Sequence, residues 1–414
     1  MRMRATHYGL CLVLAACGNS PSSGQRGDGA AAPASAPAGR AFASTSVATF
    51  DSPWAMAFLS GSTTALVTEK PGRIWLLDLR SGSKQPVSGV PRVVLSDQGG
   101  LLDIKASPDF AASRLVYLTY AEPSANGGSG LALARAQLAQ DGTRLSGLQV
   151  LWHDPAGGEG GQFGAIIAFA PDGKSLFLSS GERQRFTPAQ DPSQPLGKIL
   201  HLTLDGKPAP GNPTAGKTGA QVVTITDPPR DTVAAKDAKG RQFRWPGPNL
   251  TPSETWSSGH RNAYGLTFDA DGRLWETEMG PRGGDELNLI LAGKNYGWPL
   301  VSEGENYDGV PIPPHSTRPD VVPPKLFWVP SISPTSLLIY EGKLFPQWKG
   351  NGFIGALSGQ ALIRVTFSGD TAQKADRWDM GHRIRWVGEG PDGAIYLLED
   401  GDGARLLRLT PPRR

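Results

Sequence analysis

The chain has 414 residues and a formal net charge of +3, and 39% of its residues are hydrophobic. A nucleic-acid partner would need basic residues clustered on one face; the sequence has no run of basic residues, so no such partner is expected. The two cysteines, Cys11 and Cys17, lie near the N-terminus, which excludes a disulfide framework for the rest of the chain.

The first 17 residues have the features of a bacterial lipoprotein signal. Arg2 and Arg4 precede an apolar run, residues 10–16, which ends at Cys17 in the sequence Leu-Ala-Ala-Cys. The run is too short to cross a bilayer, which takes roughly 20 residues. We therefore expect lipid on Cys17 and a protein anchored in the cell envelope, in the outer membrane and facing the periplasm. An ordinary cleaved signal without lipid is the alternative.

Residues 18–44 are rich in Gly, Ser, Ala and Pro, so we expect a flexible tether. Residues 45–414 follow as one domain, long enough to bury a large core. Propellers and barrels of this length are commonly single domains. Within the domain, residues 208–252 are rich in Pro, Thr and Asp with little alternation, and we expect a long insertion there.

The composition of the domain indicates many short strands joined by tight turns. Gly and Pro number 53 and 36 and are dispersed among β-branched and aromatic runs. Four turn sequences precede alternating strands: Ser107-Pro-Asp-Phe110, Ala170-Pro-Asp-Gly173, Asp269-Ala-Asp-Gly272 and Gly390-Pro-Asp-Gly393. No segment shows sustained helical periodicity, so we expect an all-β fold, a radial array of four-stranded antiparallel sheets with five to seven blades.

The segment 258–299 carries the strongest functional signal. Two strands joined by an Asp-Gly turn lead to a glycine-rich loop, Met279–Gly284, and a carboxylate pair, Asp285 and Glu286. An aromatic turn, Asn295–Trp298, closes the segment. This order resembles the pyrroloquinoline quinone (PQQ)-dependent soluble aldose sugar dehydrogenases, the glucose/sorbosone dehydrogenase family. The resemblance extends over most of the expected domain and implies a six-bladed β-propeller.

The resemblance implies a PQQ site. PQQ is a planar ortho-quinone with three carboxylates, and guanidinium groups pair well with carboxylates. The cofactor contacts of the family match Arg261 and Asn262 in Gly-His-Arg-Asn, and Arg383 and Arg385 in His-Arg-Ile-Arg. Because alternate residues of a strand share a face, both of the latter arginines are expected to face the central pocket, with Ile384 pointing away. Ordinary surface arginines are the alternative.

The resemblance also implies a calcium ion held by the backbone carbonyls of Gly280 and Pro281, with Asp285 close by. Oxygen ligands are those that calcium prefers. In the family a serine or threonine hydroxyl reaches a cofactor carboxylate, and the matching residue is Ser331. A glutamine lies at the edge of substrate and cofactor, and the matching residue is Gln98, for which a turn amide is the alternative.

The general base is where the sequence departs from the family. The family has a histidine before the strand that leads into Pro-Asp-Gly, and Gln162 takes its place here. An amide cannot accept a proton at neutral pH, and general-base assistance contributes about 10²- to 10⁴-fold. Two family cations are also missing, because an arginine and a lysine are replaced by Ile166 and Ser358.

Other groups near Gln162 could serve as the base. His153, Asp154 and Glu159 lie in the preceding glycine-rich loop, and Glu182 stands where relatives carry aspartate. A carboxylate in a partly dry pocket can have its pKa raised toward neutral pH. We expect His153 to be a solvated loop residue and His260 to order its own loop.

The sequence thus predicts a PQQ-dependent oxidoreductase that oxidises the C1 hydroxyl of an aldose, or a related alcohol. A hydride passes to the quinone, and the electrons then leave for an external acceptor. The first alternative is a non-catalytic or much weakened propeller that binds a sugar or quinone, because Gln162 replaces the family histidine. The second is a lactonase-type hydrolase, which needs a cage of Glu, Asn and Asp ligands that the sequence does not supply in any specific pattern.

Overall fold

The structure is a computed structural model that describes residues 41–125, 127–226 and 240–412. The expected signal, Cys17 and most of the expected tether lie outside the described residues. The first strand begins at Ala43, so the expected tether ends slightly earlier than residue 44. None of the helices in the described part of the chain is long and apolar enough to cross a bilayer.

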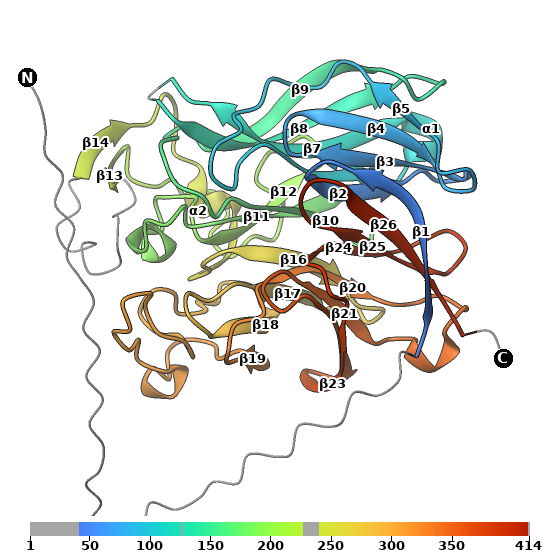
Figure 1. Cartoon of the computed structure of the whole chain (residues 1–414). Helices are drawn as coiled ribbons and strands as arrows, with labels where there is room; N and C mark the ends of the chain where they lie inside the picture. Colours follow the sequence, from blue (N-terminus) through green and yellow to red (C-terminus); the bar gives the residue numbers. More distant parts are fainter. Residues whose placement is uncertain (1–40, 126, 227–239, 413–414) are drawn as a thin grey trace, which may run out of the picture. The chain divides into compact units, whose positions relative to one another are not determined.

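Six four-stranded antiparallel sheets follow one another along the chain (Figure 1). Blades one and two contain β2 (Pro53–Phe58), β3 (Thr64–Glu69), β4 (Arg73–Asp78) and β5 (Lys84–Val87), then β6 (Leu101–Ala106), β7 (Leu115–Pro123), β8 (Ser129–Leu138) and β9 (Leu145–His153). Blades three and four contain β10 (Gly164–Phe169), β11 (Ser175–Ser180), β12 (Lys198–Thr203) and β15 (Thr255–Ser258), then β16 (Ala263–Phe268), β17 (Leu274–Glu278), β18 (Asp285–Ile290) and β19 (Leu326–Trp328). Blades five and six contain β20 (Pro334–Ile339), β21 (Gly352–Ala356), β22 (Ala361–Ser368) and β23 (Thr371–Asp379), then β24 (Ile384–Glu389), β25 (Ile395–Glu399), β26 (Ala404–Thr410) and β1 (Ala43–Phe50).

The first strands of the blades form a ring in which β2, β6, β10, β16, β20 and β24 each contact the next, and β24 contacts β2. These inner strands are almost wholly buried, whereas the outermost strands such as β23 are mostly exposed. A strand packed on both faces can be continuously apolar, as in Gly164–Phe169. The expected six-bladed β-propeller is confirmed.

The Asp-Gly turns occupy equivalent places in the blades. Gly173, Gly272 and Gly393 have φ of 68°, 80° and 75°, the left-handed region that such turns require. Each joins the first strand of its blade to the second, and the turn at residues 107–110 does so through the short helix α1 (Phe110–Ser113). The remaining helices of the described residues are single turns: η1 (Thr187–Gln190), α2 (Thr251–Glu254), η3 (His315–Thr317) and η4 (Pro346–Trp348).

The last blade is closed by the first strand of the chain. β1 pairs with β26 in antiparallel register, from Ala43 opposite Thr410 to Phe50 opposite Ala404. The ring is therefore sealed by backbone hydrogen bonds between the two ends of the domain rather than by packing alone.

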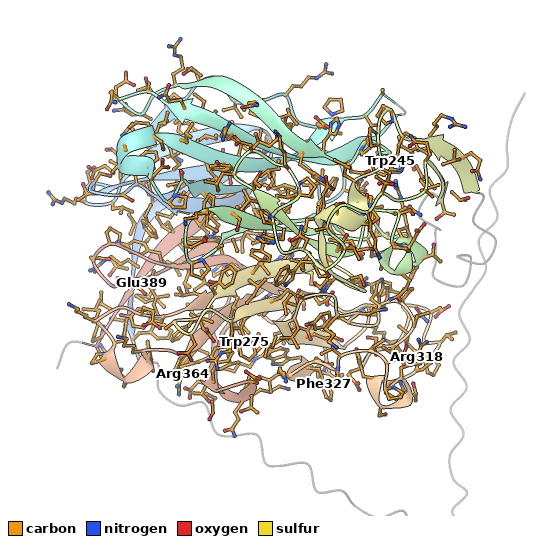
Figure 2. All side chains as sticks on the ribbon, turned by 180° about the vertical axis from the view of Figure 1, so that it is seen from behind. Trp245, Trp275, Arg318, Phe327, Arg364 and Glu389 are labelled. Atoms are coloured by element: carbon orange, nitrogen blue, oxygen red, sulfur yellow. The ribbon has the colours of Figure 1, made fainter. Side chains whose placement is uncertain are left out.

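Blade three carries an additional hairpin between its third and fourth strands. β13 (Val222–Thr226) and β14 (Gly240–Arg244) pair with each other and with no strand of the blades. Val223, Ile225 and Phe243 bury a small cluster against Ala156, with Trp245 packed on Phe243 (Figure 2). The hairpin therefore covers the glycine-rich loop that precedes β10.

The two ends of the ring differ. A cavity of about 480 Å³ lies among all six inner strands, and its lining includes residues at their carboxyl ends, such as Lys105 and Glu389. Glu389 is labelled in Figure 2. Most of the residues expected to be functional precede the inner strands or lie in the loop between β17 and β18, so they lie at the other end. Arg385 lies within β24 and lines the cavity.

Candidate active site

Residues from four blades converge at the amino ends of the inner strands. Gln98 precedes β6, Gln162 precedes β10, and Arg261 and Asn262 precede β16. Ser331 precedes β20 in the same way. Because the inner strands run in one direction around the ring, the propeller topology brings these segments together, although they are up to 233 residues apart in sequence.

Gln162 lies at the centre of this group. Its backbone N–H donates to Gln98 Oε1 at 2.9 Å, and that oxygen also accepts from the Tyr264 hydroxyl at 3.1 Å. When the side-chain nitrogen of Gln162 faces Glu182 Oε1, the side-chain oxygen accepts from Arg261 Nη2 at 2.8 Å. This orientation gives both amide atoms complementary partners, and Gln162 is buried.

The backbone around Gln162 is held in uncommon conformations. Among the described residues, Gln162, Ala165, Arg183, Gln184 and Phe186 are five of the ten non-glycine residues with positive φ. Such conformations persist only where the surroundings enforce them, and they cluster at functional sites.

Arg183 fixes the conformation of the glycine-rich loop that precedes β10. It is buried, and it donates to the carbonyls of Ser129, Gly158, Gly160 and Gly161 at 2.7 to 3.3 Å. The guanidinium group thereby connects the start of β8 to the glycine-rich loop before β10. The sequence analysis missed this residue, because its partners are backbone carbonyls, three of them from glycines.

Arg261 connects blade three to the glycine-rich loop of blade four. Its Nη1 donates to the carbonyl oxygens of Met279 at 3.0 Å and Gly280 at 2.8 Å, and its Nη2 to the Tyr307 hydroxyl at 3.3 Å. Its guanidinium group lies 5.2 Å from the centre of the Trp298 ring. The Gly280 carbonyl, expected to be a calcium ligand, therefore accepts hydrogen bonds from a side-chain cation in this structure.

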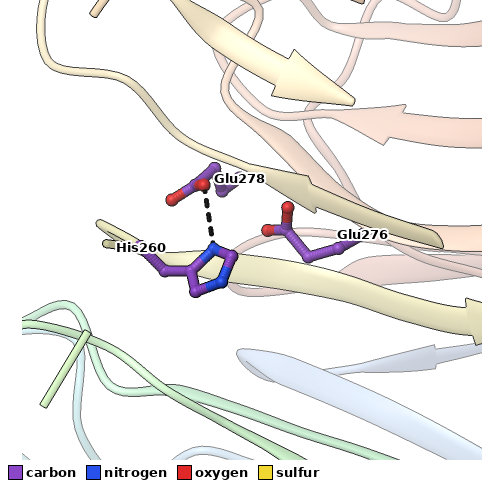
Figure 3. Close-up of side chains that lie close together, drawn as sticks. All are labelled: His260, Glu276 and Glu278. Carbon is purple, nitrogen blue, oxygen red and sulfur yellow. Dashed lines mark hydrogen bonds and ion pairs between the residues drawn. The ribbon is translucent and has the colours of Figure 1, made fainter. Parts of the chain in front are cut away.

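The backbone of Arg261 and Asn262 is fixed by a buried carboxylate. Glu278 Oε2 accepts the N–H of Arg261 at 2.5 Å and that of Asn262 at 3.3 Å. Its Oε1 lies 3.2 Å from His260 Nδ1. Figure 3 marks this contact with a dashed line. The other ring nitrogen of His260 contacts Ser257 Oγ at 2.9 Å. His260 thus orders its loop, and both of its ring nitrogens are occupied by residues other than Gln162.

A group of buried carboxylates lies behind this loop. His260, Glu276 and Glu278 each offer one ligand atom, and these atoms lie within 4.8 Å of one another (Figure 3). Asn288 Nδ2 donates to Glu276, Glu278 and Glu286 at 3.1 to 3.3 Å. Burial, reinforced by the charge of Glu278, raises the pKa of Glu276 and of Glu286. The Asn288 side chain therefore holds the three carboxyl groups together through hydrogen bonds.

Asp285 links the glycine-rich loop to blade five. Its Oδ1 accepts the N–H of Gly280 at 2.9 Å, and its Oδ2 accepts the Ser331 hydroxyl at 2.6 Å and the N–H groups of Ile332 and Ser333. The Ser331 hydroxyl, expected to donate to a cofactor carboxylate, donates to Asp285 here. An open cleft of about 780 Å³, lined by Pro281, Tyr307 and Ser331 among others, adjoins these residues.

Ser358, which replaces a lysine of the family, lines the same cleft. Its hydroxyl lies 2.8 Å from Ser333 Oγ and 3.3 Å from the Ser331 carbonyl oxygen. The site therefore has a small hydroxyl side chain at the position where the family resemblance implies a lysine.

The arginines of blade six share one carboxylate. Asp400 accepts from Arg383 Nε and from Arg385 Nε at 2.8 Å each. Against the effect of burial, the two arginines lower the pKa of Asp400. Arg385 lines the central cavity and Ile384 is buried in the core, as alternation predicts. Arg383 precedes the strand, and 48% of its side chain is exposed.

Lys70 is a cation of this region that the sequence analysis missed. Its Nζ donates to the carbonyl oxygen of Asp97, next to Gln98, at 3.4 Å. Burial, and then the charge of Arg385, lowers its pKa. Lys70 lies in the turn after β3, and only the closing of the ring brings that turn beside blade six.

The other candidate bases differ in burial. His153 contacts Glu122 Oε1 at 2.7 Å and its side chain is 52% exposed, so it is a solvated residue as expected. Glu159 is also exposed. Asp154 is buried, and its Oδ1 accepts the N–H of Ala156. Among these and Glu182, Glu182 is the residue in contact with the Gln162 side chain.

Comparison with known proteins shows what this arrangement is similar to. The family model described as Glucose / Sorbosone dehydrogenase matches residues 50–232 and 247–408. The chain is 34% identical over 370 residues to the aldose sugar dehydrogenase YliI of Escherichia coli (strain K12), covering 87% of this chain and 90% of that protein. It is 24% identical over 421 residues to quinoprotein glucose dehydrogenase B of Acinetobacter calcoaceticus, covering 82% and 81%.

Solved structures of sugar dehydrogenases are also similar to this chain. The crystal structure of the soluble aldose sugar dehydrogenase from Escherichia coli in the apo-form is 33% identical with a TM-score of 0.78, covering 90% of this chain and 100% of that one. The PQQ-bound form of the aldose sugar dehydrogenase from Streptomyces coelicolor is 28% identical with a TM-score of 0.65, covering 91% and 99%.

Proposed function

The chain belongs to the glucose/sorbosone dehydrogenase family, and from this premise we propose that it is a PQQ-dependent sugar dehydrogenase that oxidises the C1 hydroxyl of an aldose. The observation that carries the proposal is Arg261. This cation is almost fully buried at the amino ends of the inner strands, yet no carboxylate forms an ion pair with it among the described residues. A buried cation without a carboxylate partner favours an anionic ligand.

The donor set fits an aromatic tricarboxylate. Arg261 Nε and Trp298 Nε1 are buried and have no hydrogen-bond partner among the described residues. Lys70 and Arg385 add positive charge on the side of blades one and six. Arg261 and Trp298 would hold a PQQ carboxylate, with the cleft beside Tyr307 as its entrance. PQQ, when bound, supplies the ortho-quinone that accepts two electrons from the sugar.

Calcium fits the same loop less well. The carbonyl of Gly280 is a suitable oxygen ligand, but it already accepts a hydrogen bond from Arg261 Nη1. A calcium ion at that carbonyl would require Arg261 to turn away. We therefore propose calcium only as a partner of bound PQQ, and no step of the proposed reaction depends on it.

The residues of the chain would orient the sugar as follows. Arg261 Nη2, which faces the Gln162 side-chain oxygen, would donate to the C1 oxygen of the substrate and stabilise negative charge there. Gln98 is fixed by Tyr264 and by the backbone of Gln162, so it would present its amide to the same edge. The electrons would then leave for an external acceptor.

The second candidate function is binding without efficient turnover. Gln162 and Ile166 favour it, because neither can accept a proton and both are buried where the family resemblance predicts a base and a cation. On this alternative the chain would bind a quinone or sugar and oxidise it slowly.

One experiment separates the two. PQQ and calcium chloride are added to the purified apo-protein, the quinone absorbance is recorded, and glucose is then supplied with a redox dye. Binding with turnover supports the dehydrogenase, and binding with no dye reduction supports the second candidate. Absence of any absorbance change would contradict the PQQ proposal.

We also propose that the chain is a lipoprotein anchored at Cys17. The support is the sequence Leu-Ala-Ala-Cys and the lack of any other cysteine after it. Replacing Cys17 by Ser should move the protein from the membrane fraction to the soluble fraction. Equal retention of the Cys17→Ser protein and the parent in the membrane fraction would contradict the anchor.

A further inference from the structure

The contacts of Gln162 lead directly to a carboxylate. Its side-chain oxygen is 2.8 Å from Arg261 Nη2, and its side-chain nitrogen contacts Glu182 Oε1. The amide cannot take a proton at neutral pH, whereas a carboxylate can. A candidate proton acceptor therefore lies one side chain beyond the position where the family has its histidine.

Glu182 is built into blade three at the end of β11. It is 1% exposed, and its backbone N–H donates to the Arg261 carbonyl at 3.0 Å. Its carboxylate accepts the N–H groups of Gln184 and Phe186. The preceding residue must be Gly181, because a Cβ there would lie 1.9 Å from the Gln162 carbonyl oxygen. Glu182 is thus held against Gln162 from both sides.

The charges around Glu182 suit a base. Arg261 faces it from blade four, and Arg183 follows it in the chain. Burial outweighs Arg261 and raises the pKa of Glu182. A carboxylate whose pKa is raised by burial is a stronger base than an exposed one.

We propose that Glu182 is the proton acceptor of this active site and that the Gln162 side chain keeps Glu182 and Arg261 in place until the substrate replaces it. The inference rests on the proposed function. It deepens that function by assigning the proton to a carboxylate where the family resemblance implies a histidine.

The geometry gives a balanced step. The carboxamide of Gln162 bridges Arg261 and Glu182, and the H–C–O–H group of an aldose is of similar size. When the Gln162 side chain turns aside, the C1 oxygen accepts from Arg261 Nη2 and its O–H points at Glu182 Oε1. The O–H bond breaks, the proton goes to Glu182, and the electron pair left on oxygen forms the carbonyl of the lactone. The hydride on C1 would leave with its electron pair, and bound PQQ would supply the ortho-quinone that accepts these two electrons.

A purely structural Glu182 would use the same contacts to fix the turn at residues 182–186, so the test must separate the two roles. We compare Glu182→Gln, Glu182→Asp and a control, Glu159→Gln, which removes an exposed carboxylate from the same region. PQQ binding is measured first by quinone absorbance, and turnover is then measured as a function of pH.

We expect Glu182→Gln to bind PQQ within about threefold of the parent and to lose about 10²-fold or more in kcat, with the acidic limb of the pH profile abolished. Glu182→Asp should recover part of the rate and keep the limb, because the carboxylate remains. Glu159→Gln should match the parent. A folded, PQQ-loaded Glu182→Gln protein with parental turnover and pH profile would overturn the proposal.

Two further measurements protect the test. In infrared spectra of the apo-protein, a protonated carboxyl band should titrate above the usual glutamate range and be missing from Glu182→Gln; its absence from the parent overturns the proposal.

If Glu182→Gln does not fold, the double variant Gln162→His with Glu182→Asp replaces it. There the acidic limb should move to the pKa of a histidine, and an unmoved limb overturns the proposal. Failure of the parent to bind PQQ would count against the proposed function instead.

Discussion

Blade four and blade three each supply one half of the candidate active site, and they differ in what fixes their side chains. In blade four, Glu278 and Asp285 hold the backbone of Arg261 and of the glycine-rich loop through N–H groups. In blade three, Gln162 is fixed by strained backbone and by contacts of its side chain with Arg261 and Glu182.

This difference separates two tasks. Anion binding depends on Glu278 and Asp285, the buried carboxylates that hold the backbone of blade four. We call them the frame of blade four, and we expect anion binding to fail if either carboxylate is lost. Proton transfer depends on the identity of a few side-chain atoms, which can change by substitution while the frame remains. The chain carries such substitutions in blade three and keeps the family motif in blade four. Binding and proton transfer should therefore be separable by mutation.

The largest effect is expected from Arg261→Ala. Loss of the charged hydrogen bonds of this buried guanidinium should weaken PQQ binding by about 10²- to 10³-fold, at about 1.5–3 kcal/mol for each such bond. The measurement is a titration followed by quinone absorbance. Arg282→Ala is the control, because Arg282 lies in the same loop with a side chain 62% exposed. Equal weakening of PQQ binding in both variants would show that Arg261 has no specific role in binding PQQ.

Gln162→His tests the part of the site in blade three, on which proton transfer depends. A histidine between Arg261 and Glu182 would supply a proton acceptor of the family type. Turnover of glucose should rise by about 10²-fold if Glu182 does not already act as the base, while PQQ binding changes little. Gln149→His, on an exposed strand of blade two, is the control. If the parent already turns over at about 10 per second and the variant gains nothing, proton transfer in blade three of the parent is not impaired.

Asp285→Asn should destabilise the frame of blade four. The amide would place N–H groups against the N–H groups of Ile332 and Ser333, at a cost of about 2–3 kcal/mol in the free energy of unfolding. Urea denaturation at neutral pH measures the loss. Asp271→Asn, in an exposed turn of the same blade, should cost less than about 1 kcal/mol. Similar losses would contradict the special role of Asp285.

The smallest effect concerns pH and Glu254, at the edge of blade three. Burial raises the pKa of Glu254 to about 6, against a hydrogen bond from Trp152 Nε1. Because its folded-state pKa is raised, its stabilising contribution is complete below the unfolded-state pKa of 4.5 and is lost as pH rises through about 6. Glu254→Gln should remove a loss of at most about 2 kcal/mol across this window. Urea denaturation at both ends of the window, with identical pH dependence in parent and variant, would refute this assignment.

Much of the fold followed from the sequence. The Asp-Gly turns before alternating strands indicated repeated sheets, and the motif around Arg261 supplied the number of blades. The family resemblance also indicated which residues would meet, although they are far apart in the sequence. What it could not supply were the contacts between blades. Glu182 was one of several possible bases until the structure placed it against Gln162.

The direction of side chains in loops was equally hard to predict. The Gly280 carbonyl was expected to face a metal ion, and instead accepts from Arg261, because two carbonyls in one loop attract whichever cation is near. Lys70 could not be found at all, since its neighbour Arg385 is 315 residues away in the sequence. Local patterns fix strands and turns, but not which loops of a closed ring meet.

The pairing of β1 with β26 also determines how the domain responds to mechanical load. Ala43 lies opposite Thr410, so tension applied through the segment before Ala43 acts on the terminal rung of this ladder. The rungs would then open one after another, toward Phe50, rather than sharing the load as they do when two strands are sheared. The strand that locks the ring is also the first one that a pull from the N-terminal side would unzip.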